Sequence, residues 1–261
     1  MKRTRIKNIP FDIPKELCEY LDGSWIYDSS CSPEARVYYI ERRDLFLKRS
    51  AKGTLKNEAL MNAYFHSKGI GAEVIAYESD GYYDWLLTRR VAGEDATHSD
   101  YLSDPKRLAE CLGTRLRELH ETDFRDCPRK NVMVPYLTLA EENYKSGCYD
   151  KSHFPDSFGY ASADDAWRVL SEGKELLLPE VLIHGDYCLP NIILDGWRLS
   201  GFIDVGHGGV GDRHIDLFWG SFTLGFNLGT NEYTARFFDA YGRDKIDPDR
   251  LRVVAAAEVF G

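Results

Sequence analysis

Three oxygen-bearing side chains lie in one apolar stretch of the chain, residues 181–206. Asp186 follows His184 and Gly185, Asn191 comes five residues after Asp186, and Asp204 comes thirteen residues after Asn191. Carboxylate and amide oxygens are the ligands that Mg²⁺ prefers, and a carboxylate can also take the proton of a substrate hydroxyl. The pattern predicts Asp186 as a general base and Asn191 and Asp204 as ligands of Mg²⁺.

The same division of labour occurs in protein kinases, where an Asp accepts the hydroxyl proton and an Asn and a later Asp hold the metal. Phosphoryl transfer also needs a cation on the phosphates. Lys48 lies near the end of a β-rich run, and Glu58 comes ten residues later in a helical pattern. A strand lysine paired with a helix glutamate binds the α- and β-phosphates in kinases, so Lys48 and Glu58 are candidate nucleotide-binding residues.

A turn rich in serine precedes the strand of Lys48 and is the candidate phosphate-covering loop. It contains no G-x-G-x-x-G pattern. Ser30 and Ser32 could offer hydroxyl and backbone N–H groups to phosphate instead.

The elements that must position these residues follow from hydrophobic periodicity. Four runs rich in β-branched and aromatic residues predict strands at 36–40, 44–48, 72–79 and 83–90. One helix is expected within residues 54–69, with an apolar face of Leu55, Ala59, Leu60, Ala63 and Tyr64. Beyond the connector at 90–94, helical patterns occupy residues 105–120, 136–147, 163–177, 212–225, 231–241 and 247–260.

A β-hairpin interrupts the helical part of the chain. Its expected strands, residues 191–195 and 198–203, flank Asp195-Gly196, and Asp-Gly between apolar runs is a strong hairpin signal. The hairpin would bring its two ends, with Asn191 and Asp204, to the loop of Asp186. Asp216, on the helix that follows, could brace that loop by accepting backbone N–H bonds, and Asp212 could cap the helix.

The predicted fold class is therefore α+β, with two lobes. The small, β-rich N-terminal lobe with one helix spans residues 1–90, and the larger, mainly helical C-terminal lobe spans residues 91–261. We expect the first lobe to bind the nucleotide and the second to carry the catalytic and acceptor-binding residues.

Composition restricts the class of partner. Of the 261 residues, 43% are hydrophobic and 29% are charged, as in ordinary globular proteins, and the net charge is −9. An acidic chain argues against a nucleic-acid partner and is compatible with a cationic small substrate. No apolar run reaches the length of a membrane span, and the N-terminus lacks the apolar core of a signal peptide, so we expect a cytoplasmic protein without a membrane partner.

With these motifs in place, the chain resembles the aminoglycoside phosphotransferases, and within them the 3′-phosphotransferase (kanamycin kinase) branch. The resemblance runs from SCSPEARVYYI to AAAEVFG, and its most specific segments are HGDYCLPNIILDGWRLSGFIDVG, LHETDFRDCP and FLK with NEA. It implies a protein-kinase-like fold. It also implies transfer of the γ-phosphoryl group of ATP or GTP to an aminoglycoside hydroxyl with Mg²⁺, with the roles given above for Asp186, Asn191, Asp204, Lys48 and Glu58.

The resemblance also implies sites that spacing alone does not. The strand at 85–89, with Leu87 and Arg89, looks like the hinge whose backbone meets the nucleotide base. Asp150 and Asp156, in the loop that covers the antibiotic, and Glu258 and Phe260, near the C-terminus, look like acceptor-binding residues. The chain departs from the family where a paired carboxylate is reduced to Ala257-Glu258 and where His207 replaces the usual Arg.

Two further functions stay open at this stage. A smaller acidic set would also suit a kinase of another hydroxylated small molecule, such as a sugar, a choline-like compound or an amino alcohol. A nucleotide-binding module without turnover would need to have lost a catalytic or metal-binding side chain, and Asp186, Asn191 and Asp204 are all present.

Overall fold

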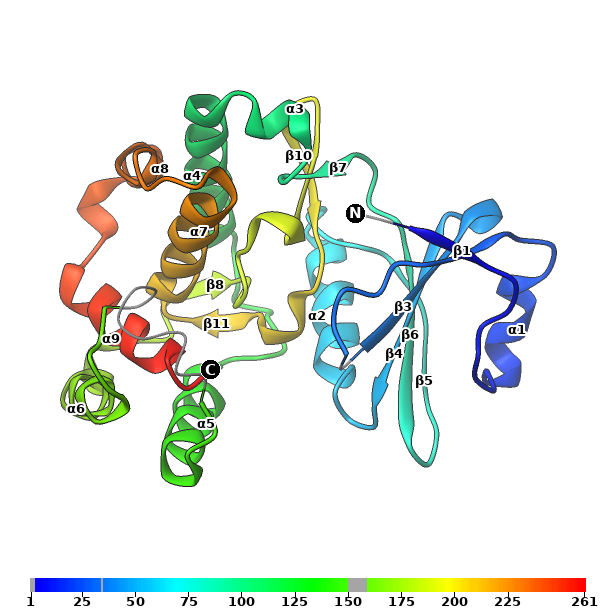
Figure 1. The fold of residues 1–261 in the computed structure, drawn as a ribbon, viewed down its shortest axis with the longest axis horizontal. Helices are drawn as coiled ribbons and strands as arrows, with labels where there is room; N and C mark the ends of the chain where they lie inside the picture. The colour runs from blue at the N-terminus through cyan, green and yellow to red at the C-terminus, as the bar shows by residue number, and fades with distance from the viewer. Residues whose placement is uncertain (1–2, 34, 150–158) are drawn as a thin grey trace. The chain divides into compact units, whose positions relative to one another are not determined.

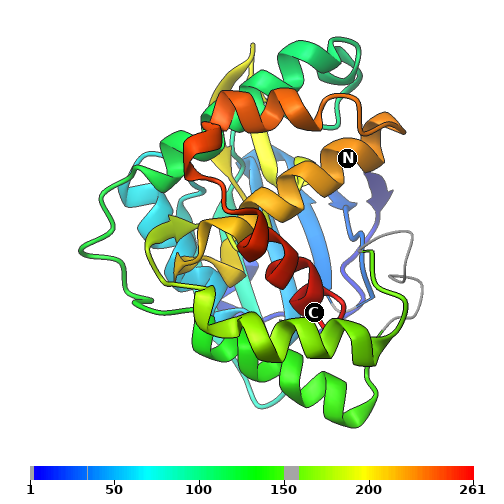
Figure 2. The ribbon, with the colours of Figure 1, turned by 90° about the vertical axis from the view of Figure 1, so that its left-hand side faces the viewer.

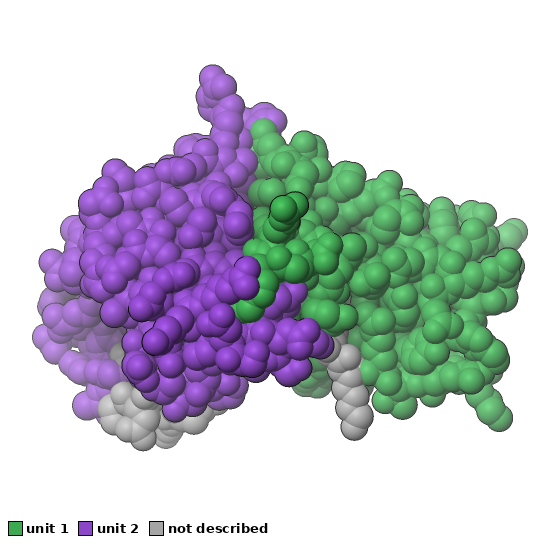
Figure 3. All heavy atoms as spheres, turned by 90° about the horizontal axis from the view of Figure 1, so that it is seen from above, with its two compact units in different colours: residues 1–95, 191–206 green, residues 96–190, 207–261 purple. Residues whose placement is uncertain are grey.

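The computed structural model describes residues 3–33, 35–149 and 159–261. Within it the chain forms two compact units, coloured separately in Figure 3: unit 1 comprises residues 1–95 and 191–206, and unit 2 comprises residues 96–190 and 207–261. The predicted lobes had a single boundary near residue 90. The observed division instead returns the chain to unit 1 for the hairpin segment, so that Asn191 and Asp204 belong to the same unit as Lys48.

Unit 1 is built on a six-stranded antiparallel sheet in the order β1-β2-β3-β4-β6-β5 (Figure 1). The strands are β1 (Thr4–Ile6), β2 (Ile26–Asp28), β3 (Ala35–Ile40), β4 (Leu45–Ala51), β5 (Val74–Ser79) and β6 (Tyr83–Arg89). Helix α1 (Lys15–Leu21) precedes β2, and helix α2 (Lys56–Ser67) follows β4 and contacts β5. The four predicted strands and α2 are confirmed.

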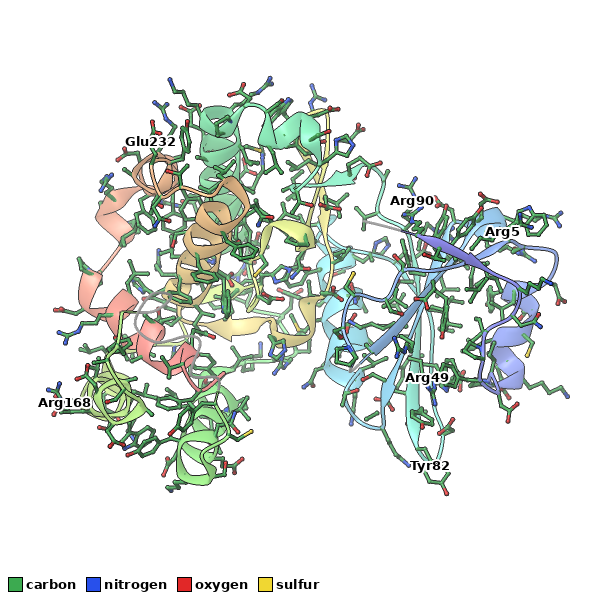
Figure 4. All side chains as sticks on the ribbon, viewed as in Figure 1. Arg5, Arg49, Tyr82, Arg90, Arg168 and Glu232 are labelled. Atoms are coloured by element: carbon green, nitrogen blue, oxygen red, sulfur yellow. The ribbon has the colours of Figure 1, made fainter. Side chains whose placement is uncertain are left out.

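Strand alternation gives the sheet two different faces. On one face, Leu45 and Leu47 of β4 join the buried core that also contains Leu17 of α1. Arg49 follows on this face, and its guanidinium lies 3.8 Å from the ring centre of Phe11 and 3.4 Å from that of Tyr83 (Figure 4). The intervening β4 residues, including Lys48, are therefore presented to the opposite face.

The expectation of one helix in the small lobe was incomplete, because α1 is a second one. It has seven residues and a single buried apolar side chain, Leu17, so it carries too little periodic signal to be found in the sequence. The three-residue strands β1 and β2 escaped prediction for the same reason.

A three-stranded sheet in the order β10-β9-β7 completes unit 1. It consists of β7 (Glu94–Asp95), β9 (Ile192–Asp195) and β10 (Arg198–Phe202). The predicted hairpin is confirmed, and its two-residue loop is Gly196-Trp197, with φ values of 53° and 70°. Positive φ at both positions is the signature of the type I′ turn, whose twist matches that of the flanking strands.

Unit 2 is mainly helical (Figures 1 and 2). Its helices are α3 (Ser99–Leu102), α4 (Pro105–His120), α5 (Met133–Ser146), α6 (Ala163–Gly173), α7 (Arg213–Leu228), α8 (Thr234–Tyr241) and α9 (Pro248–Glu258). A small antiparallel ladder joins β8 (Val181–Ile183) to β11 (Gly209–Gly211). Short 3₁₀ turns occur at Glu41–Arg43, Lys174–Leu176, Leu189–Asn191, Val205–His207 and Arg243–Lys245.

Local signals explain where the unit 2 helices begin. The Asp104 side chain accepts a hydrogen bond from the Arg107 N–H and caps α4, and Asp247 caps α9 in the same way. Asp212, considered as a cap from the sequence, accepts the His214 N–H at the start of α7. Strand β11 was not predicted, because Gly-Val-Gly has almost no strand propensity and depends on pairing with β8.

The core of unit 2 forms where α9 packs against α6 and α7, as Figure 2 shows with α9 in red, α6 in lime and α7 in orange. Phe260 is fully buried in it. Phe237 is also buried, whereas the side chain of Phe226 is 77% exposed. Within the described residues, no helix has both the length and the apolar composition required to cross a membrane.

Candidate active site

Unit 1 contains a cavity of about 260 Å³ on the face of the sheet that carries Lys48. Its walls are largely apolar, and charged groups gather around Lys48. The residues that line it include Ser32, Phe46, Lys48, Glu58, Asn62, Ala72, Leu86, Thr88, Arg89, Ile193, Ile203 and Asp204. An apolar cavity with a few convergent polar groups is the usual form of a small-molecule site.

Lys48 joins two acids that are far apart in sequence. Its Nζ lies 2.8 Å from Glu58 Oε2, on α2, and 2.7 Å from Asp204 Oδ1, just after β10. Burial alone would lower the pKa of Lys48, but the charges of Asp204 and Glu58 raise it above its ordinary value, so Lys48 is a permanent cation. The predicted pairing of Lys48 with Glu58 is thus present in the structure.

Glu58 is itself a buried carboxyl. Burial is the main cause that raises the pKa of Glu58, and the neighbouring charge of Asp204 raises it further, while Lys48 acts in the opposite direction. The ammonium group is therefore what keeps two close acids together at the cavity wall.

The serine turn takes two roles rather than one. Ser32 lines the cavity, as expected for a phosphate-covering residue. The Ser30 side chain instead braces the turn: its Oγ accepts the Val37 N–H at 2.9 Å, while the Ser30 N–H donates to Asp28 Oδ1 at 2.9 Å. Ser30 therefore shapes the loop and is not among the residues that line the cavity.

The two hinge candidates on β6 also differ. Leu87 packs into the core on the far side of the sheet, because successive strand residues face opposite sides, and Leu86 and Thr88 line the cavity in its place. The backbone of Leu87 is paired with both β4 and β5. Arg89 does line the cavity, and Arg90 follows it with its Nε 2.7 Å from Asp44 Oδ1 (Figure 4).

Asn62 is a cavity residue that the sequence analysis missed. It lies one turn after Glu58 on α2 and is only 2% exposed. Its Oδ1 is buried and has no hydrogen-bond partner among the described residues. A buried amide oxygen normally has a partner, so its position in this wall favours a polar ligand or a bound water in the cavity.

The two candidate metal ligands lie at opposite ends of the hairpin. The Ile203 N–H donates to the Asn191 carbonyl at 3.0 Å, which ties the hairpin ends together. Asn191 is 6% exposed, whereas the Asp204 side chain is 46% exposed and can accept a further ligand. No group of three His, Cys, Asp or Glu side chains in the described ranges could hold a metal, but Mg²⁺ needs only one or two protein oxygens together with phosphate and water.

Unit 2 holds Asp186 in a braced loop after β8. Gly185 has a φ of +82°, and a Cβ at this position would meet the His207 backbone at 2.6 Å, so only glycine fits. The buried Asp216 of α7 accepts the N–H groups of His184 and Gly185 at 2.7 and 2.8 Å. The predicted brace is confirmed, and it sets the path of the backbone into Asp186.

A chain of buried polar groups supports this brace. His120 Nε2 lies 3.1 Å from Asp216 Oδ2, and His120 Nδ1 lies 2.8 Å from the Tyr241 hydroxyl. Burial lowers the pKa of His120, so the ring is neutral at physiological pH. His184 is fully buried and accepts the Asp186 N–H at 3.2 Å, consistent with the structural role expected for it.

The candidate acceptor residues at the C-terminus are both buried. Glu258 accepts a hydrogen bond from the Tyr136 hydroxyl at 2.7 Å. Burial is the main cause that raises the pKa of Glu258 to about 7, and the charge of Asp186 adds to it. Phe260 packs edge-on against Tyr144, Tyr149 and Trp167, so it supports the region through its position in the core. Asp150 and Asp156 lie outside the described residues.

Unit 1 has an apolar cavity with Lys48, Glu58 and Asp204 in its wall, and unit 2 has a loop in which Asp216 fixes the backbone next to Asp186. These features are those of a phosphotransferase with a kinase-like fold. The family model described as the phosphotransferase enzyme family matches residues 32–254. The chain therefore belongs to this phosphotransferase family.

Two relatives are similar to this chain over most of its length. A probable aminoglycoside 3′-phosphotransferase of Lactococcus lactis subsp. lactis is 46% identical over 262 residues, which covers 99% of this chain and all of that protein. An aminoglycoside 3′-phosphotransferase of Niallia circulans is 30% identical over 79% of each chain.

Solved structures agree on the fold. An aminoglycoside phosphotransferase of Streptomyces rimosus matches with a TM-score of 0.75 at 22% identity, covering 88% of this chain and 91% of that one. The same protein has been solved in complex with ADP and streptomycin. An aminoglycoside 3′-phosphotransferase of type VIII gives a TM-score of 0.67 at 22% identity and covers 99% of this chain and 94% of that one. These matches confirm the protein-kinase-like fold.

Proposed function

We propose that this phosphotransferase is an aminoglycoside kinase that transfers the γ-phosphoryl group of ATP or GTP to the 3′-hydroxyl of the antibiotic. The observation that carries the proposal is the double ion pair of Lys48, at 2.8 Å from Glu58 and 2.7 Å from Asp204, in the wall of the unit 1 cavity. The choice of acceptor rests on the full-length relative at 46% identity, whose name specifies an aminoglycoside 3′-phosphotransferase.

Unit 1 binds the nucleotide in this proposal. The apolar walls formed by Phe46, Ala72 and Ile193 suit a purine ring, and Lys48 neutralises phosphate oxygens. Glu58 holds the lysine side chain in place, which limits the entropy lost when the phosphates bind. Ser32 offers its hydroxyl from the covering turn.

Asn191 and Asp204 fit Mg²⁺ as oxygen donors from one hairpin, and Asp204 is accessible enough to take a new ligand. When bound there, the ion would neutralise charge on the β- and γ-phosphates. Lys48 would then exchange part of its contact with Asp204 for phosphate oxygens.

Asp186 of unit 2 is the proposed base. The bond between the γ-phosphorus and the oxygen that bridges it to the β-phosphate breaks, and a new bond forms to the acceptor hydroxyl oxygen. The hydroxyl proton passes to Asp186, and the products are ADP or GDP and the phosphorylated acceptor. Glu258, when ionised, would attract an ammonium group of the acceptor, as would Asp150 and Asp156. The proposal includes a cytoplasmic location, where the nucleotide is supplied.

The purified protein tests the proposal directly. With kanamycin and ATP or GTP, coupled detection of ADP or GDP should show turnover that Asp186→Ala abolishes while nucleotide binding, measured by calorimetry, persists. The same calorimetry should show that Lys48→Ala weakens nucleotide binding more than Asp186→Ala does. Expression in a susceptible bacterium should raise its tolerance to kanamycin.

Each rival function has its own outcome in the same assay. Turnover with a sugar, a choline-like compound or an amino alcohol and none with any aminoglycoside would replace the acceptor and keep the chemistry. Nucleotide binding without turnover on any acceptor would mean a binding module. Unchanged phosphoryl transfer in Asp186→Ala would remove the assignment of the base.

A further inference from the structure

Cys188 lies two residues after the proposed base and turns back onto it. The Cys188 N–H donates to the Asp186 carbonyl at 2.7 Å, which closes a tight three-residue turn. This turn brings the Cys188 Sγ to 2.8 Å from Asp186 Oδ1. The thiol is half-buried, and the Thr223 side chain of α7 lies within hydrogen-bonding reach of it.

The thiol stays protonated in this position. Burial is the main cause that raises the pKa of Cys188 far above its ordinary value, and the negative charge of Asp186 raises it further. A protonated thiol next to a carboxylate is a hydrogen-bond donor, and it is a poor nucleophile because the thiolate is the reactive form. In the contact with Asp186, the thiol of Cys188 therefore donates the hydrogen bond and the carboxylate oxygen accepts it.

We infer that Cys188 is a positioning residue for Asp186, an inference that rests on the proposed phosphotransferase function. The S–H group holds Oδ1 and so fixes the orientation of the carboxylate that accepts the proton of the acceptor hydroxyl. A base acts well only when the accepting oxygen is held in line with the proton it takes, and rotation of an unrestrained carboxylate would spoil that alignment.

The side chain of Thr223, next to the Cys188 thiol, is itself held in one position. Its hydroxyl donates to the Trp219 carbonyl at 2.8 Å and so holds a defined rotamer on α7. The thiol thus lies between a side chain fixed to a buried helix and the carboxylate that it orients. Serine at position 188 can keep the donor, whereas alanine removes it and retains most of the packing.

Steady-state kinetics test the inference. Cys188→Ala should lower kcat about tenfold, with the KM of both substrates within about twofold, because alignment acts on the chemical step. Cys188→Ser should restore kcat to within about threefold of the wild type. Cys127→Ala is the matched control, since Cys127 is a buried free thiol whose Sγ donates to the Arg129 carbonyl at 3.5 Å, and the kcat of this variant should be unchanged.

Two outcomes would overturn the inference: a kcat for Cys188→Ala within about twofold of the wild type, or a Cys188→Ser variant as slow as Cys188→Ala. Thermal unfolding of all variants measures whether a loss of kcat follows a loss of stability. If Cys127→Ala is as destabilised as Cys188→Ala and yet keeps its kcat, the loss of kcat in Cys188→Ala is not caused by lower stability.

A measurement without turnover separates this inference from the proposed function. Alkylation of Cys188, followed by mass spectrometry, should be slow in the wild type and clearly faster in Asp186→Asn, which removes the carboxylate charge. The exposed Cys148 serves as an internal control with an unchanged rate in both proteins. An equal rate at Cys188 in both proteins would refute the thiol–carboxylate contact even if the enzyme transfers phosphate.

Discussion

Replacing Lys48 by methionine should destabilise the nucleotide-free protein, and more strongly at pH 8 than at pH 5. Methionine keeps the length of the side chain and removes the charge, which leaves Glu58 without its cation. The Lys48 and Glu58 side chains are 20% and 11% exposed, so this is a largely buried pair. Removing one partner of a buried pair costs about 3–5 kcal/mol.

Two further effects determine the net cost: the second ion pair adds little, and protonation of Glu58 reduces the loss. The pair with Asp204 contributes at most about 1 kcal/mol, because the Asp204 side chain is 46% exposed and solvent screens it. Glu58 can also take up a proton once Lys48 is gone, which limits the loss. We therefore expect a decrease of about 2–4 kcal/mol in the free energy of unfolding at pH 8.

The pH dependence follows from the direction of the Glu58 shift. Burial raises the pKa of Glu58 in the folded state, and loss of Lys48 raises it further. A carboxyl whose folded pKa exceeds the unfolded value lowers stability progressively as pH rises between the two values. A larger fraction of Glu58 is protonated at pH 5 than at pH 8, so the penalty should be smaller at pH 5.

Urea unfolding, followed by fluorescence at both pH values, measures these differences. Lys48→Met/Glu58→Gln should recover most of the loss, since no buried charge remains. Arg168→Met is the surface control, because the Arg168–Asp165 pair is 61% and 37% exposed and should change stability by less than about 1 kcal/mol (Figure 4). An equal loss for Lys48→Met at pH 5 and pH 8, or no recovery in the double variant, would refute the reasoning.

Three further outcomes are expected. Because burial raises the pKa of Glu258 to about 7, the KM for a cationic acceptor should fall as pH rises through 7, and Glu258→Gln should remove this dependence in initial-rate assays. Gly185→Ala should cost about 2–4 kcal/mol in urea unfolding, whereas Gly53→Ala, with a similar φ of +86° and open space, should cost about 1 kcal/mol. Asp216→Ala should lower kcat and cost about 2–4 kcal/mol of stability by leaving two backbone N–H groups without their acceptor, while calorimetry shows unchanged nucleotide affinity.

Strong local signals made much of this fold predictable. Helix α4 begins at Pro105 and ends at His120 as expected, because a capping Asp, a first-turn proline and a regular apolar stripe all agree. The hairpin was predictable from Asp195-Gly196 between two apolar runs, although its loop lies one residue further on, at Gly196-Trp197. The Lys48–Glu58 pair could be anticipated because a strand and the helix after it restrict where the two side chains can meet.

Other features depend on tertiary contacts that local sequence does not encode. Strand β11 is stabilised by its pairing with β8. Helix α1 is stabilised by the burial of one leucine, Leu17. The face of β6 that lines the cavity was not predictable for a different reason: a strand buried on both faces shows no alternation, so the sequence does not indicate which side chains face the cavity.

The misassigned face of α2 has a physical explanation that is useful beyond this chain. Apolar residues alone favoured a face containing Leu60, but Leu60 is 43% exposed. Tyr64 of the predicted face is buried, but the other buried residues of α2 form a different stripe. Glu58, Met61, Asn62 and Phe65 have the i, i+3, i+4, i+7 spacing of a helix core face. Two of its four positions are polar, so a count of hydrophobic residues rejects it. Burying an acid and an amide is costly unless charged or polar partners compensate, and here Lys48 compensates the acid. A complete helical stripe with polar residues at core positions is therefore better interpreted as the wall of a site than as a failed helix face.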